Sequence, residues 1–124
     1  MIGQIRRFHF PDINDLEKWV PGDPDCFGFL LQVMIGPPGG EGEDSFEIQV
    51  CTPACLIQHY ERDGMVIGRH HLIVFGYNWD RIKAFIAKFV TRSPGDNWRE
   101  VATKLGRLGR WEFEDYDDRP VVQL

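Results

Sequence analysis

The chain has 124 residues and a formal net charge of −5, with 43% hydrophobic and 27% charged residues. This composition is typical of one soluble globular domain and excludes an intrinsically disordered chain. No apolar run approaches the roughly 20 residues that a membrane span needs, and no apolar segment near the N-terminus indicates a secretory signal. We therefore expect a single cytoplasmic domain over residues 1–124, with an acidic C-terminal tail over residues 114–124 and no membrane partner.

The first half of the sequence predicts three strands. Residues 2–10 read as a strand, and residues 12–20 form a polar stretch with at most one helical turn. Residues 27–35 are almost continuously apolar, which favours a central strand, and residues 46–50 alternate cleanly, as in a half-buried strand. The last two strands form a hairpin whose loop, residues 36–44, is long, acidic and rich in glycine. This loop is either a binding element or a tip without a role.

The second half of the sequence predicts helices with clear start signals. Thr52 before Pro53 starts a short helix over residues 53–62, and residues 69–75 form a fourth strand. The next helix begins at Asn78, and a further one begins at Asp96 or Asn97. Their apolar stripes are Ile82, Phe85, Ile86, Phe89 and Val90 in one, and Trp98, Val101, Ala102, Leu105 and Leu108 in the other.

The C-terminal residues 111–116 predict a short strand or extended tail. Their period of two places Trp111 and Phe113 on one side as structural anchors, and Glu112 and Glu114 on the other side, open to a partner. The order of all elements predicts an α+β fold, with an antiparallel sheet of about four to five strands and helices packed mainly on one face.

The sequence offers no convincing catalytic or metal site. The three cysteines, Cys26, Cys51 and Cys55, cannot all pair within the chain. The adjacent His70 and His71 point to opposite faces of a strand and cannot grip one metal together. We therefore predict no catalytic residue, no metal and no cofactor. One alternative is a small metal-dependent or His/carboxylate-dependent enzyme, with a pocket where His70 or His59 meets Glu, Asp or Cys. Another is a general adaptor or oligomerising domain.

The uneven distribution of acidic residues favours a basic protein as the partner. Residues 1–62 carry a net charge of −6, from four Lys/Arg and ten Asp/Glu, whereas residues 63–124 carry +1, from ten Lys/Arg and nine Asp/Glu. An acidic surface disfavours direct binding to nucleic acid and favours a basic protein. The predicted partner-binding residues are the acidic side chains of the hairpin loop and tail, with Trp19 and Tyr116 as aromatic anchors. The full set is Trp19, Glu41, Glu43, Asp44, Glu112, Glu114, Asp115, Tyr116, Asp117 and Asp118.

Several motifs occur in a recognisable order. They are Phe27-Gly28-Phe29, Val50-Cys51-Thr52-Pro53, Gly68-Arg69-His70-His71-Leu72-Ile73-Val74, Trp79-Asp80-Arg81-Ile82, Gly95-Asp96-Asn97-Trp98-Arg99-Glu100-Val101-Ala102 and Arg110-Trp111-Glu112-Phe113-Glu114-Asp115-Tyr116. Together, over roughly residues 1–116, they resemble the immunity protein 8 family. Members of that family are small cytosolic bacterial proteins encoded beside polymorphic or contact-dependent-inhibition toxins.

The resemblance implies that the chain binds the C-terminal domain of a cognate toxin and neutralises it, without enzyme activity. It implies no particular set of contact residues. An acidic protein suits the basic active cleft of a nuclease-type toxin, because complementary charge speeds association.

Overall fold

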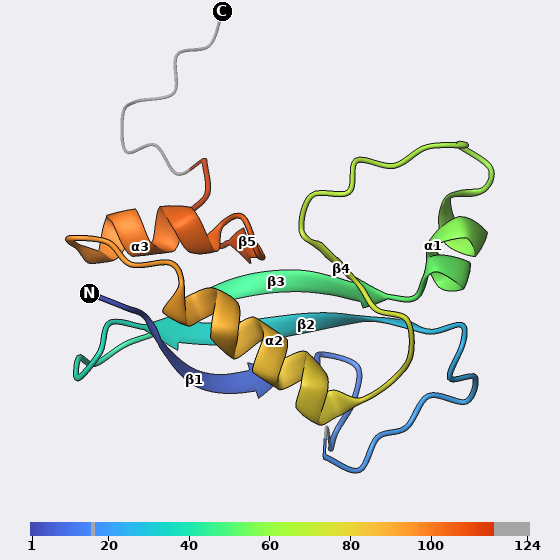
Figure 1. Ribbon diagram of the computed structural model, residues 1–124, viewed down its shortest axis with the longest axis horizontal. Coiled ribbons are helices and arrows are strands. Elements are labelled where there is room, and N and C mark those ends of the chain that lie inside the picture. Colours follow the sequence, from blue (N-terminus) through green and yellow to red (C-terminus); the bar gives the residue numbers. More distant parts are fainter. Residues whose placement is uncertain (16, 116–124) are drawn as a thin grey trace, which may run out of the picture.

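The computed structural model describes residues 1–15 and 17–115. Figure 1 shows α2 lying across one face of a sheet, with α3 and β5 near one end of β3 and α1 near the other. The elements are β1 (Gln4–His9), β2 (Gly28–Gly36), β3 (Asp44–Cys51), α1 (Pro53–Tyr60), β4 (His71–Ile73), α2 (Trp79–Thr91), α3 (Trp98–Leu105) and β5 (Arg110–Trp111). None of the helices in the described ranges is long and apolar enough to cross a membrane.

The five-stranded sheet has the order β1-β2-β3-β4, and β5 pairs with the other end of β3. The pairs β1–β2, β2–β3 and β3–β5 are antiparallel, which confirms the predicted hairpin and the α+β class. The pair β3–β4 is parallel, so the prediction of an antiparallel sheet is wrong for this strand. The reason is the connection: the chain passes from β3 through α1 and residues 61–70, and such a crossover brings the next strand back in the same direction.

The core lies between one face of the sheet and the helices α2 and α3. Alternate residues of β2 and β3 point into it, because successive side chains of a strand point to opposite faces. The buried residues of the two central strands are Phe29, Leu31, Val33, Ile35, Phe46, Ile48 and Val50. They pack with Ile82, Ile86 and Val90 of α2 and with Val101, Ala102 and Leu105 of α3. Thus α2 and α3 both supply core residues against this face, whereas α1 contributes no buried residue. The prediction that helices pack mainly on one face is confirmed.

The predicted helix starts are confirmed at all three positions. The Thr52 hydroxyl accepts the N–H of Cys55, and Asn78 Oδ1 accepts the N–H of Arg81 at 3.1 Å. Asn97, rather than Asp96, begins α3, since its Oδ1 accepts the N–H of Glu100 at 2.9 Å. These side chains satisfy backbone donors that a helix leaves without partners at its N-terminus.

The first predicted strand, over residues 2–10, is limited to Gln4–His9, and two strands of the second half are shortened more strongly. The strand expected over residues 69–75 is assigned only over His71–Ile73, and His70 before it has a left-handed backbone, with φ of 65°. The strand expected from Trp111 is limited to Arg110–Trp111. The chain then turns, and the N–H of Glu114 donates to the carbonyl of Trp111 at 2.9 Å. Strict alternation after Trp111 is therefore lost, and Phe113 stays 43% exposed.

Candidate functional site

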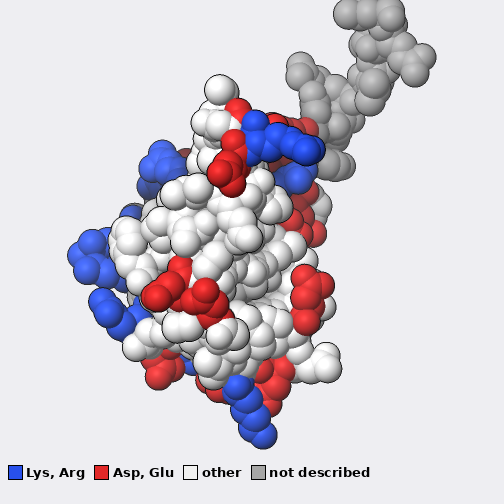
Figure 2. Space-filling model, turned by 90° about the vertical axis from the view of Figure 1, so that its right-hand side faces the viewer, with Lys and Arg blue, Asp and Glu red and all other residues white. Residues whose placement is uncertain are grey.

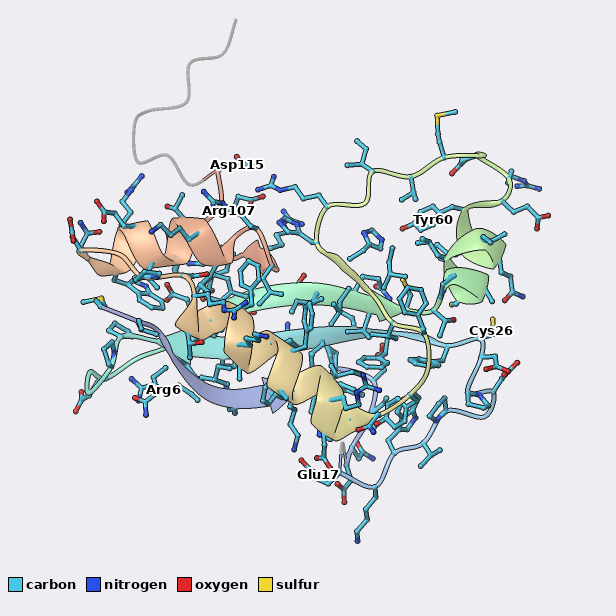
Figure 3. The ribbon with its side chains drawn as sticks, in the orientation of Figure 1. Arg6, Glu17, Cys26, Tyr60, Arg107 and Asp115 are labelled. Atoms are coloured by element: carbon cyan, nitrogen blue, oxygen red, sulfur yellow. The ribbon has the colours of Figure 1, made fainter. Side chains whose placement is uncertain are left out.

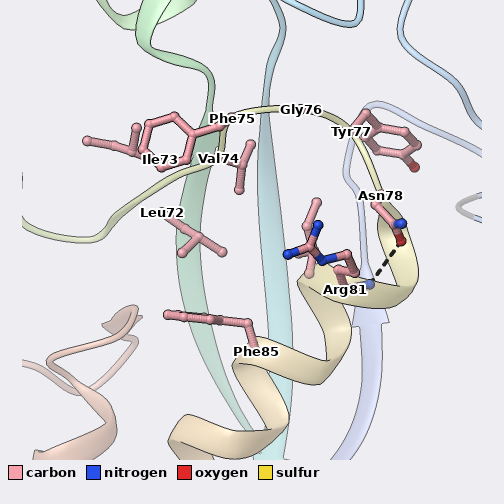
Figure 4. A pocket seen from close by; sticks show the side chains of 10 residues that line it. Leu72, Ile73, Val74, Phe75, Gly76, Tyr77, Asn78, Arg81 and Phe85 are labelled. Atoms are coloured by element: carbon pink, nitrogen blue, oxygen red, sulfur yellow. Dashed lines mark hydrogen bonds between the residues drawn. The ribbon is translucent and has the colours of Figure 1, made fainter.

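An apolar groove with a volume of about 540 Å³ lies between residues 72–77 and α2. Figure 4 shows the side chains that line it, from the end of β4, the following loop and the first turns of α2. Apart from the polar Asn78, the charged Arg81 and the hydroxyl of Tyr77, its lining is apolar or glycine, from Leu72, Ile73, Val74, Phe75, Gly76, Ile82, Phe85 and the ring of Tyr77. Such a concave apolar lining with few polar groups is typical of binding sites.

The fold explains why this groove stays open. The N–H of Val74 donates to the carbonyl of Cys51 at 2.9 Å, which holds the segment after β4 against β3. Ile82 and Ile86 of α2 face the core, whereas Phe85 lies on the flank of the helix toward β4. Since β4 is the last strand of the sheet, Phe75 remains 88% exposed and Phe85 57% exposed.

A wider apolar surface continues beside the groove. Its large exposed side chains come from α1 and from residues 61–75: Ile57, Met65, Val66, Ile67, Ile73 and Phe75. Figure 2 looks at this side of the molecule and shows many uncharged side chains, with acidic side chains near the middle of the face and Lys and Arg at its left border and at its top. Single exposed apolar residues are normal, but a contiguous group of them usually marks an interaction surface.

The acidic residues of the hairpin loop and of the C-terminal segment converge, because both lie at the start of β3. Asp44 accepts hydrogen bonds from two indoles, Trp98 Nε1 at 2.8 Å and Trp111 Nε1 at 3.0 Å. The Glu112 carboxylate accepts the N–H of Ser45 at 2.8 Å. The carboxylates of Asp44 and Glu112 therefore hold the fold together, a role that the sequence analysis missed.

The remaining predicted acids of these segments differ in their partners. Glu43 pairs with Arg7 at 2.8 Å, and Glu114 pairs with Arg69 at 2.6 Å. Glu41 and Asp115 are exposed. Tyr116, Asp117 and Asp118 lie outside the described residues.

Trp19 lies near the opposite end of β2 from Asp44, in a cluster of aromatic side chains. Its ring is 5.4 Å from that of Phe29 and 5.2 Å from that of Tyr77, in edge-to-face contacts. Trp19 is only half-buried, but it packs against the core. Burial in this region also raises the pKa of the Tyr77 hydroxyl. The structure thus places Trp19 apart from the acids with which the sequence analysis grouped it.

A second cavity, of about 230 Å³, is the nearest match to the enzyme alternative. It is lined by Cys51, Cys55, His59 and His71 among others, beside Tyr60, which Figure 3 labels on α1. Burial raises the pKa of the Cys51 and Cys55 thiols, and a protonated thiol is a poor nucleophile. No group of three or more His, Cys, Asp or Glu side chains within the described part of the chain could hold a metal ion.

The two adjacent histidines have structural contacts. His70 Nε2 lies 2.8 Å from the carbonyl of Gly106, and His71 Nδ1 lies 3.0 Å from the carbonyl of Arg69. His70 lines neither the groove nor the second cavity. Each imidazole therefore ties the start of β4 to a backbone carbonyl.

Comparison with known protein families identifies a family that the chain matches. A sequence model of the immunity protein 8 family matches residues 3–116, which include the whole groove and every helix and strand. No curated protein and no solved structure matches the chain. The match covers most of the chain and agrees with the resemblance seen in its motifs. The chain belongs to the immunity protein 8 family, a family of non-enzymatic proteins that neutralise toxins.

Proposed function

We propose that this chain neutralises the C-terminal domain of a cognate toxin by stoichiometric binding in the bacterial cytoplasm, and that the apolar groove is the centre of the contact. The main support for the groove as the contact site is the pair of exposed aromatic side chains, Phe75 and Phe85, that line it. Aromatic anchors that enter pockets and become fully desolvated contribute most of the binding energy in many protein interfaces.

The physical argument is that these side chains are costly to leave in water. Complete burial of a phenylalanine side chain stabilises a complex by about 1.5–3 kcal/mol, before the entropy of association is counted. Phe75 and Phe85 keep much of this surface available to a partner, because Phe75 is almost fully exposed and more than half of Phe85 is exposed. The apolar residues of α1 and of residues 61–70 would extend the contact around them.

The test combines rescue with binding. Co-expression of the chain should protect cells from the toxin encoded beside it, and the purified pair should form a 1:1 complex. Phe75→Ala and Phe85→Ala should each weaken binding by about 1–3 kcal/mol, with little change in thermal unfolding. Val20→Ala is the matched control, since Val20 is an apolar side chain that is 72% exposed and does not line the groove.

The outcomes separate function from location. Absence of both rescue and complex with the wild-type chain would contradict the proposed function. If the wild type binds tightly, and if Phe75→Ala and Phe85→Ala bind the toxin with the same affinity as Val20→Ala, only the proposed location is contradicted.

A second candidate mode is an acidic surface that enters the basic cleft of a nuclease-type toxin. It is favoured by the convergence of the hairpin loop and the C-terminal segment at the start of β3, where Glu41 and Asp115 are exposed. Arg7 and Arg69, however, pair with acids of these same segments and reduce their negative potential. We therefore propose that exposed acids such as Glu41 steer a basic toxin during approach, and that the groove provides most of the affinity.

A further inference from the structure

We propose that the free edge of β4 pairs with an extended segment of the toxin, which adds a strand to the sheet and places alternate apolar side chains in the groove. This inference rests on the proposed function and specifies how the toxin is held. In such strand addition, backbone hydrogen bonds contribute affinity, and pockets for alternate side chains contribute specificity.

The backbone of β4 has one satisfied side and one open side. On the satisfied side, the N–H of Gln49 donates to the carbonyl of His70 and the N–H of Val74 donates to the carbonyl of Cys51, both at 2.9 Å. Because N–H and C=O groups alternate in direction along a strand, those of Ile73 point away from β3. No strand in the described part of the chain pairs with this side, since β4 ends the sheet order.

The open side also lacks the usual protection. Natural edge strands carry charged side chains, proline or a bulge, which prevent other strands from pairing with them. The run His71-Leu72-Ile73-Val74-Phe75 contains no Lys, Arg, Asp, Glu or Pro. Its shortness is the one protective feature, and even so the ladder to β3 extends as far as Val74. An edge of this kind is suited to pairing with another strand.

The groove supplies the matching side-chain site. Leu72 and Val74 are half-buried against the core, so their side of β4 faces α2, and Phe85 and Ile82 form the opposite wall. A strand added beside β4 would point alternate side chains into this space. Among the described residues that line the groove, Arg81 is the only Lys, Arg, Asp or Glu. The occupant is therefore an extended toxin segment with apolar residues at alternate positions and one carboxylate that reaches Arg81.

The decisive variant is Ile73→Pro, compared with Ile73→Thr. Proline removes only the outward N–H and keeps the bonds of β4 to β3, which come from neighbouring residues. Threonine shortens the side chain but keeps the N–H and favours an extended backbone. Titration with the toxin's C-terminal domain should give a Kd raised at least about tenfold for Ile73→Pro and less than about threefold for Ile73→Thr.

The result that overturns the inference is a Kd for Ile73→Pro equal to that of the wild type. The proposed function would then stand, because the wild type still binds; failure of the wild type to bind would instead overturn the proposed function. If circular dichroism shows that Ile73→Pro is unfolded, amide hydrogen exchange of the wild type tests the inference instead. The Ile73 amide should become at least about tenfold more protected in the complex, and unchanged exchange would overturn the inference.

A second copy of this chain is the competing occupant of the same edge. The mass of the free protein in solution, measured by light scattering, distinguishes the two occupants. A monomer that binds toxin through Ile73 supports the inference. A dimer that Ile73→Pro dissolves, without a change in toxin affinity, would overturn it.

Discussion

The strands β1 and β4 end the main strand order of the sheet, and their free edges differ in how well they are protected against pairing with another strand. β1 has a bulge between Ile5 and Arg7, which leaves Arg6 without a partner in β2. Arg6 Nη2 instead donates to the carbonyls of Pro37 and Gly40, at 2.6 and 2.8 Å, and so holds the hairpin loop beside β1. Figure 3 shows Arg6 beside this loop, at the opposite end of the sheet from Tyr60 and Cys26. β4 has no charged residue and no bulge in its pairing with β3.

The chain therefore tolerates an unprotected edge on one side of the sheet only. Bulges and charged residues prevent pairing with other strands, and β1 has both. The long acidic loop over residues 36–44, which from sequence alone was either a binding element or a tip without a role, is fixed to the protected edge by Arg6. The unprotected edge lies beside the apolar groove and its exposed aromatic side chains. The two edges therefore separate a closed side of the sheet from a side suited to a partner.

The largest effect is expected when β4 receives the protection that β1 has. Ile73→Lys places a charge on the open edge, where its ammonium would lose water on pairing with a toxin strand. We expect the Kd for the toxin domain to rise by about thirtyfold or more, equivalent to about 2 kcal/mol, as measured by calorimetry. The thermal midpoint of the free protein should stay nearly constant, because Ile73 is already 42% exposed.

Lys18→Ile is a useful companion to Ile73→Lys, because it changes charge and apolar surface in the opposite sense at an exposed position outside the groove. It should leave the Kd unchanged. If Ile73→Lys bound toxin as tightly as the wild type, the contrast between the two edges would have no bearing on binding.

Local features of the fold were predictable from sequence. Thr52, Asn78 and Asn97 start helices because each side chain accepts a backbone N–H only three residues ahead. The stripe Ile82, Ile86 and Val90 follows helical periodicity alone. Such features depend on neighbours in sequence, so the printed chain contains all the information they need.

Features that depend on distant pairing were not predictable. The direction of β4 is set by its register with Gln49–Cys51, to which the pattern of residues 69–75 gives no clue. Phe85 belongs to the predicted apolar stripe, but periodicity defines only the direction of a side chain, not whether a sheet lies opposite it. The sequence did contain an indication of this exposed surface, because Phe85 and Phe89 make the apolar face of the helix wider than the stripe that packs into the core.

The acidic candidates show the same limit. From sequence, Asp44 is predicted in the hairpin loop and Glu112 on a short strand or extended tail, both open to a partner. Their hydrogen-bond donors, the indoles of Trp98 and Trp111 and the N–H of Ser45, come from residues 54 to 67 positions away. Acids held in this way are positioned by the fold, and their substitution would disturb the sheet as well as any interface.

A smaller effect, on stability alone, should come from the closed side. A methyl group at Gly36 would overlap the backbone carbonyl of Gly42, so the hairpin loop would have to move away from Arg6. We expect Gly36→Ala to lower the free energy of unfolding by about 1–2 kcal/mol, measured by urea denaturation. Gly22→Ala is the control, since a methyl group there meets no other atom within 4 Å. The toxin Kd of the folded protein should not change, and a tenfold loss of affinity would show that the closed side also contributes to binding.

The smallest effect is expected for Glu41→Lys, which tests the steering role of the acidic loop. Glu41 is exposed, and its substitution removes no described contact, so the sheet should be undisturbed. Association with a basic toxin should slow by about two- to fivefold at low salt, and the difference should vanish near 0.5 M salt, where charges are screened within about 5 Å. Asp12→Lys makes the same charge change at an exposed position beyond the other end of β1, so it separates net charge from location. Equal slowing by both variants would mean that the toxin responds to the total charge of the chain. Slowing by Glu41→Lys alone, without faster dissociation, would place the approach of the toxin at the closed side and its final contact at the open one.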